Sequence, residues 1–213
     1  MGIYNNGILG AFSGLVGSVV GSSFRGHNVM RSRPRKSNKP ASLLQIMQRT
    51  KFAKAISFLT PAKMILSDYF GAPTGVKSRF NLAVAYHLVN AIGYVNGVAT
   101  VLYDKLVYAK GSLLAPQNLV CVASAGAQLD LTWINNSDQA GTLPSDQLMV
   151  VVVEVDSGDY EFFLNAAERI DVEAKLNLPA YLAGTDVHVY AFMAAEDGKS
   201  NSTSQHLGKF TLL

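Results

Sequence analysis

The stretch Val187-His-Val-Tyr-Ala-Phe192 decides the fold, because its side chains alternate in hydrophobicity with the period of two that is typical of a β-strand. The alternation places His188 and Tyr190 on one face of the strand and Val189 on the other. We therefore predict a strand over Asp186–Ala194.

Further stretches after Ala99 have the length and composition of strands, and turn residues separate them at near-regular spacing. The predicted strands are Val101–Tyr108, Leu119–Ser124, Gln128–Trp133, Gln147–Val155, Glu161–Asn165, Arg169–Leu176, Asp186–Ala194 and Gly208–Leu213. So many short strands predict an antiparallel β-sandwich of the immunoglobulin-like kind. Trp133, the single tryptophan, lies on an early strand, where such sandwiches often have a central aromatic residue.

The single cysteine, Cys121, excludes an internal disulfide framework. It lies in an apolar run over residues 118–123, whereas a reactive thiol needs cationic and exposed surroundings. We therefore predict a buried and inert thiol.

Two segments upstream of the strands have the periodicity of amphipathic helices. The first helix is predicted from Leu43 to about Leu59, with Ser42 as N-cap and Gln45 completing a capping box. Its apolar stripe comprises Leu44, Met47, Ala55, Ile56 and Leu59. The second helix is predicted over residues 77–92. Helices followed by a sandwich define an α+β protein.

Glycines recur every three or four residues near the N-terminus. On a helix they would line one face and form small-xxx-small pairs, but each would cost about 1 kcal/mol relative to alanine. The preferred interpretation is an extended arm, in which glycine permits unusual φ angles and close contact with another chain. The residues assigned to this assembly arm are Gly10, Gly14, Gly17, Gly21 and Phe24.

A β-hairpin is predicted within the arm. Residues 18–24 and 29–33 have strand character, and the connection over 25–28 contains Gly26 and Asn28, which tolerate positive φ.

Pro34 and Pro40 bracket a basic linker that is predicted to be exposed and extended. The sequence thus predicts three parts. They are a Gly-rich basic arm with a hairpin over 1–40, a helical segment over 41–98 and the sandwich over 99–213.

Charge is divided unevenly along the chain. The first 67 residues hold ten Lys and Arg and no acid, whereas the remaining 146 hold eight Lys and Arg and fifteen Asp and Glu. Such a split indicates parts with different partners, and the positive part could meet nucleic acid, an acidic membrane or the acidic part of a neighbouring copy. The candidate phosphate or acidic-partner contacts are Arg25, Arg31, Arg33, Arg35, Lys36, Lys39 and Arg49.

Several motifs follow one another in a specific order over nearly the whole chain. They are Asn6-Gly-Ile-Leu-Gly-Ala-Phe-Ser-Gly14, Val16-Gly-Ser-Val-Val-Gly-Ser-Ser-Phe24, Met30-Arg-Ser-Arg-Pro34, Asn38-Lys-Pro40, Gln45-Ile-Met-Gln-Arg49, Phe80-Asn-Leu-Ala83, Lys110-Gly-Ser-Leu113, Trp133, Asp146 and the segment from Asp197-Gly198 to Ser202. In this order they resemble a family of unknown function found mainly in Bacteroidota. The resemblance implies a fold and no established activity.

The N-terminal motifs are also similar, more weakly, to short N-terminal modules of phage-encoded particle proteins. The chain departs from these modules at Ala41-Ser42, where a threonine is usual, and at Leu15, where a lysine is common. Ser42 can still cap a helix, and Leu15 indicates a more buried arm. This second resemblance implies a role in a particle.

Signals of catalysis and of metal binding are missing from the sequence. The histidines His27, His87, His188 and His206 have no metal-ligand spacing with one another or with the cysteine. The acids over residues 154–161 lack the EF-hand pattern and are interpreted as solvated turn residues. There is no Gly-x-Ser-x-Gly elbow and no Walker motif. We predict no enzymatic activity and no cofactor.

The N-terminus lacks the basic segment of a secretory signal, so the sequence predicts a cytoplasmic or particle-associated protein. Residues 7–24 are uncharged but hold five glycines and four serines, which disfavours a membrane span.

The first functional hypothesis is a structural protein that self-assembles, as a virion, phage-like particle or filament subunit, through its N-terminal arm. The alternative is a nucleic-acid-binding protein that uses the acid-free segment 25–54.

Overall fold

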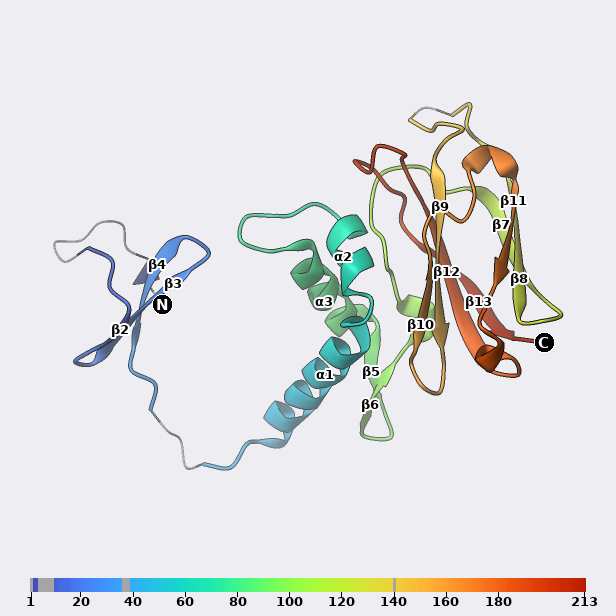
Figure 1. Ribbon diagram of the computed structural model, residues 1–213. Helices are drawn as coiled ribbons and strands as arrows, with labels where there is room; N and C mark the ends of the chain where they lie inside the picture. Colours follow the sequence, from blue (N-terminus) through green and yellow to red (C-terminus); the bar gives the residue numbers. More distant parts are fainter. Residues whose placement is uncertain (1, 4–9, 36–38, 140) are drawn as a thin grey trace. The chain divides into compact units, whose positions relative to one another are not determined.

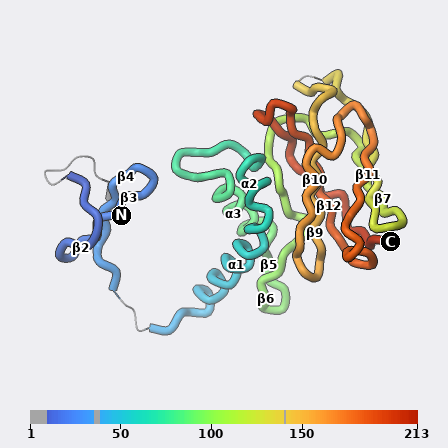
Figure 2. Tube along the Cα trace, viewed as in Figure 1, coloured from blue at the N-terminus to red at the C-terminus, as the bar shows by residue number. Residues whose placement is uncertain are grey.

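The structure is a computed structural model that describes residues 2–3, 10–35, 39–139 and 141–213. The chain forms two compact units, residues 1–42 and residues 43–213 (Figures 1 and 2). They are called the N-terminal unit and the body. The sequence-based class is confirmed, because the helices of this α+β chain are followed by an antiparallel, immunoglobulin-like sandwich.

The N-terminal unit is an antiparallel sheet whose strands lie in the order β1-β4-β3-β2. The strands are β1 (Gly2–Ile3), β2 (Gly14–Val16), β3 (Val19–Phe24) and β4 (His27–Ser32). The predicted hairpin is present, but its connection is shorter than expected. Only Arg25 and Gly26 form the turn, with φ angles of 50° and 80°, as two-residue hairpins require. Asn28 therefore pairs within a strand, opposite Ser23.

The helices of the body are α1 (Leu43–Leu59), α2 (Lys63–Tyr69) and α3 (Arg79–Asn90). The bounds predicted for α1 are confirmed, but Leu44 of its predicted apolar stripe is 73% exposed. The helix α2 was not predicted. The second predicted helix is shorter than expected, because Ser78 caps α3 by accepting a hydrogen bond from the Asn81 N–H at 3.3 Å.

A hairpin that the sequence analysis missed follows α3. Its strands are β5 (Ile92–Val95) and β6 (Val98–Val101), and Asn96 and Gly97 form the turn with φ angles of 51° and 79°. The strand predicted over 101–108 is wrong beyond its first residue. The chain there forms a short 3-10 helix, η1 (Tyr103–Lys105), and the backbone N–H of Tyr108 donates to the Ser204 hydroxyl at 2.9 Å.

The sandwich consists of a four-stranded sheet in the order β10-β9-β12-β13 and a three-stranded sheet in the order β11-β8-β7. The strands are β7 (Gln117–Ser124), β8 (Gln128–Ile134), β9 (Gln147–Glu154), β10 (Tyr160–Phe163), β11 (Glu173–Asn177), β12 (Asp186–Ala194) and β13 (Gln205–Thr211). The prediction over 169–176 is wrong at its start, where Arg169–Asp171 form the 3-10 helix η2. The last strand begins at Gln205 and not at Gly208. The other predicted strands are confirmed with small shifts at their ends.

The four-stranded sheet is covered on both faces, which gives the body two hydrophobic clusters. Along β9, Val150 and Val152 point between the two sheets, whereas Met149, Val151 and Val153 point towards the helices. A strand buried on both faces is a continuous apolar run, as residues 148–153 are. Figure 1 shows the helices and the three-stranded sheet on opposite sides of β9 and β12.

Candidate functional site

The N-terminal unit has almost no core of its own. Among its described residues only Gly21 and Val29 are buried. Leu15, Val16 and Phe24 are 53%, 61% and 57% exposed. An isolated small sheet without a buried face is marginal in water.

Of the assigned arm glycines, Gly21 has a close neighbour. A Cβ atom there would lie 2.6 Å from ring carbons of Phe12, so the absence of a side chain lets Phe12 cross the sheet. Around Gly10, Gly14 and Gly17 a Cβ atom would meet nothing within 4 Å. The close contact at Gly21 is therefore made within the chain.

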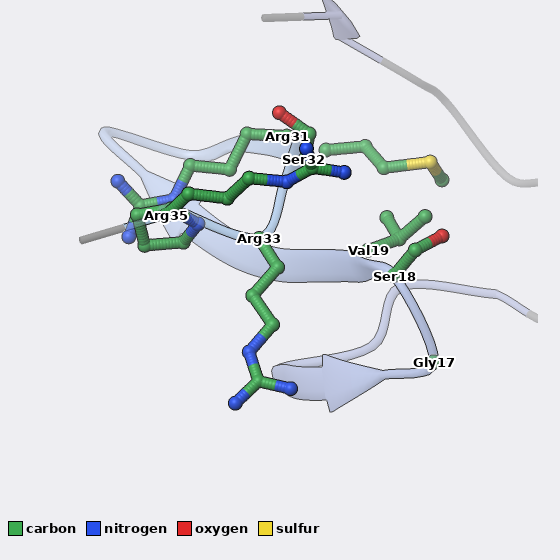
Figure 3. A pocket seen from close by; sticks show the side chains of 9 residues that line it. Gly17, Ser18, Val19, Arg31, Ser32, Arg33 and Arg35 are labelled. Atoms are coloured by element: carbon green, nitrogen blue, oxygen red, sulfur yellow. The ribbon is translucent and has the colours of Figure 1, made fainter. Parts of the chain in front are cut away.

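Cations of the N-terminal unit line a concave surface, which encloses a volume of about 1300 Å³. Arg31, Arg33 and Arg35 lie along it, and none of them forms an ion pair with another described residue. Figure 3 shows the Arg33 side chain pointing away from those of Arg31 and Arg35. The Arg25 guanidinium lies over the Phe24 ring, 5.5 Å from its centroid.

The remaining predicted contacts are placed differently. Lys36 lies outside the described residues, and Lys39 belongs to the same unit as the concave surface. Arg49 is an exposed residue of α1 and so belongs to the body. The structure thus gathers three of the predicted cations on one surface.

The body has a buried ion pair that the sequence analysis did not predict. The Nε of Arg169 donates to Asp146 Oδ2 at 3.0 Å, and both side chains are at most 1% exposed. The guanidinium also donates to the Asn136 side chain and to the Leu114 carbonyl, at 2.9 Å for the latter. Trp133 Nε1 donates to the Arg169 carbonyl at 2.9 Å. This network joins β8, η2 and two loops.

His87 is a buried structural residue of α3. Its Nε2 accepts the backbone N–H of Val107 at 3.2 Å, so Nδ1 carries the proton and donates to the Ala83 carbonyl at 2.7 Å. Burial lowers the pKa of His87. The neutral imidazole holds the segment after η1 against the helix.

His188 and His206 lie together although 18 residues separate them. Nδ1 of His188 is 2.9 Å from Nε2 of His206, and the His188 ring stacks on Tyr103 with centroids 4.5 Å apart. Burial lowers the pKa of both histidines. In the part of the chain that the structure describes, no group of three or more His, Cys, Asp or Glu is placed to bind a metal ion.

The thiol and the acids of the β9–β10 hairpin are the other reactive groups that the sequence analysis considered. Cys121 is buried as predicted, and burial raises the pKa of its thiol to about 12. The acids of the β9–β10 hairpin form no ion pair with any described residue. One of them, Glu161, accepts a hydrogen bond from the exposed Tyr181 hydroxyl at 2.9 Å.

Comparison with protein families decides where the chain belongs. Residues 11–208 match a family of unknown function, DUF6266. The chain belongs to this family. The family resemblance predicted from the motifs is thereby confirmed for DUF6266, which carries no assigned activity. No curated protein matches this DUF6266 chain.

Solved structures similar to this DUF6266 chain include fibronectin-type domains. The FN1–FN3 domains of chicken CNTN1 share 7% identity with a TM-score of 0.37, over 49% of this chain and 33% of that chain. This chain thus spans about a third of that structure. The fn3 domain of human collagen alpha-1(XX) shares 13% identity with a TM-score of 0.35, over 47% and 86% of the two chains. The FN5 domain of Drosophila Lar shares 10% identity with a TM-score of 0.32, over 46% and 92%.

Within the described residues of this DUF6266 chain, none of the helices has the length and hydrophobicity needed to cross a bilayer.

The environment of His87 predicts a pH dependence of stability. Because the folded-state pKa lies below the unfolded value of about 6.5, the unfolded chain binds more protons as the pH falls. The contribution of His87 is complete above about pH 6.5 and decreases on acidification by at most about 1.4 kcal/mol per pH unit. The free energy of unfolding, measured with urea between pH 7.5 and 5, should decrease less steeply with falling pH for His87→Asn than for the parent.

The lowered pKa values of His188 and His206 also make stability decrease with falling pH. Both proteins contain these two histidines, so the difference between the proteins reports on His87. If the free energy of unfolding depended equally on pH in the two proteins, the assignment of a neutral, buried His87 would be contradicted.

Proposed function

We propose that this protein is a non-enzymatic structural subunit that self-assembles into a virion, phage-like particle or filament through its N-terminal unit. One observation carries the proposal. The N-terminal unit leaves Leu15, Val16 and Phe24 more than half exposed, and among its described residues only Gly21 and Val29 are buried. A sheet of this size needs a further surface on which to bury its apolar side chains.

The body has the opposite property, which supports the same proposal. Its two hydrophobic clusters join all three helices and both sheets of the sandwich. It therefore has the core that an independent fold needs. The N-terminal unit then acts as an appendage that a neighbouring copy completes.

Deletion of residues 1–40 tests the proposal. We expect the parent to form large discrete or open-ended assemblies in light scattering, and the truncated protein to be a folded monomer. The far-ultraviolet circular dichroism and thermal transition of the truncated protein serve as the folding control. Normal assembly of the truncated protein would show that the N-terminal unit is not the assembly element.

Binding of nucleic acid is the second candidate function. The concave surface lined by Arg31, Arg33 and Arg35 favours it, because these cations have no acidic partner among the described residues. Neutralising about five phosphates would give a slope of about −4 to −5 for the logarithm of the binding constant against that of the salt concentration. Fluorescence anisotropy with a labelled duplex between 50 and 300 mM KCl measures that slope. Weak binding that is independent of salt would contradict this function.

A further inference from the structure

The outer face of the β11-β8-β7 sheet is uncovered in the body. The residues between its outward positions, Cys121, Leu131 and Ala174, point into the sandwich core. We call the outward positions the outer face, and they are Val120, Val122, Ser124, Gln128, Asp130, Thr132, Ile134, Glu173, Lys175 and Asn177. The strand register places Val120 opposite Thr132, and Thr132 opposite Glu173.

Three exposed apolar side chains lie on this otherwise polar face. Val120, Val122 and Ile134 are 52%, 56% and 51% exposed. An antiparallel sheet with one face in water usually presents polar residues on that face. In the same sandwich, the outward side of the four-stranded sheet is covered by helices. One outer surface of the sandwich is thus covered by helices, and the other is exposed.

One face of the N-terminal sheet also carries exposed apolar side chains. The register of β2, β3 and β4 places Leu15, Val20 and Arg31 in one row, and Phe24 lies on the same side of the sheet. Leu15 and Phe24 are more than half exposed. Two sheets with exposed apolar faces can pack face to face at a spacing of about 10 Å.

The N-terminal unit and the outer face differ in the sign of their charge. The N-terminal unit contains six Lys and Arg and no acid. The outer face carries the exposed carboxylate of Glu173, the ammonium of Lys175 and the half-buried carboxylate of Asp130, which accepts a hydrogen bond from the Ser124 hydroxyl. Asp171 lies in η2, before β11. Opposite charges around an apolar centre favour one orientation of docking.

We propose that the outer face binds the N-terminal unit of a second copy of this chain. The proposal rests on the proposed function, because it names the surface with which the N-terminal unit assembles. The N-terminal unit suits this surface because it combines exposed apolar side chains with cations and no acid.

A charge placed at the centre of the outer face tests the proposal. The full-length variant Val120→Lys/Val122→Lys changes two exposed side chains and leaves the sandwich core intact. We expect light scattering to show at least tenfold weaker association. The matched control is Val89→Lys on α3, a residue that is 79% exposed, and it should assemble as the parent does.

Cross-linking gives an independent measurement that does not depend on the lysine variants folding. Two full-length proteins, Val122→Cys and Leu15→Cys, are mixed and treated with a short bismaleimide, while Cys121 is protected by its burial and raised pKa. We expect a covalent dimer from the mixture and little from Val89→Cys mixed with Leu15→Cys. A cross-link within one chain carrying both cysteines at high dilution would overturn docking on a second copy.

The outcomes separate this inference from the proposed function. If Val120→Lys/Val122→Lys assembles as the parent does and deletion of residues 1–40 prevents assembly, the outer face is not the acceptor and the proposed function stands. The outer face is likewise not the acceptor if the variant Glu154→Lys/Asp159→Lys/Glu161→Lys fails to assemble and Val120→Lys/Val122→Lys assembles as the parent does. If the protein that lacks residues 1–40 also assembles normally, both the inference and the proposed function fail.

Discussion

Replacement of Arg169 by methionine is expected to destabilise the protein by about 3–5 kcal/mol. The guanidinium is fully buried, and its removal leaves the Asp146 carboxylate without its ion-pair partner. Among the described residues, the other donor to that carboxylate is the backbone N–H of Leu143, at 3.0 Å. Urea unfolding followed by circular dichroism measures the loss.

The control for Arg169→Met is Lys199→Met, which breaks the exposed pair between Lys199 and Asp197 at 3.4 Å. Exposed pairs contribute about 0–1 kcal/mol, so this variant should remain close to the parent. The double variant Arg169→Met/Asp146→Leu should recover part of the lost stability, because it removes the unpaired charge. A loss below about 1 kcal/mol for Arg169→Met would contradict the role assigned to the network.

The second large effect is expected at Gly111. A Cβ atom there would lie 2.8 Å from the Asn201 carbonyl carbon and 2.9 Å from its Nδ2. Asn201 cannot easily move, because its carbonyl accepts the Leu113 N–H at 3.0 Å and its Nδ2 donates to the Tyr69 carbonyl at 2.9 Å. We expect Gly111→Ala to lower the free energy of unfolding by about 1–3 kcal/mol.

Gly93→Ala is the matched control for Gly111→Ala in the same unfolding experiment. A Cβ atom at Gly93 would lie 3.4 Å from the Leu102 side chain, which is ordinary van der Waals contact. This variant should therefore stay close to the parent. Equal stability of the two alanine variants would show that the backbone around Asn201 relaxes.

The sandwich could be predicted from the sequence because its signals are local. Alternation along Asp186–Ala194 and turn residues between the strands are properties of short segments. The β5–β6 hairpin also has a local signal, the Asn96-Gly97 pair, which is typical of a two-residue turn. The prediction of a strand over 101–108 did not use this signal. The continuous apolar run in β9 is a further local signal, which is typical of a strand covered on both faces.

The contacts between distant segments could not be predicted from a single sequence. Arg169 meets Asp146 because a loop and η2 converge at one end of the sandwich, and no spacing rule connects the two residues. The pairing of His188 with His206 depends on the register of β12 with β13. In the candidate assembly site, the basic residues could be predicted from composition. The outer face could not, because Val120 and Val122 have the same sequence signal as core residues.

The four consecutive valines of β9 have a consequence for how the chain is made. Residues 150–153 form a β-prone, uncharged segment of the kind that aggregates when it is exposed. Synthesis proceeds from the N-terminus, so the segments that form α1, α2 and α3 leave the ribosome before β9 does. The helices that cover one side of this strand are thus available when it emerges, and the order of elements along the chain protects the nascent protein.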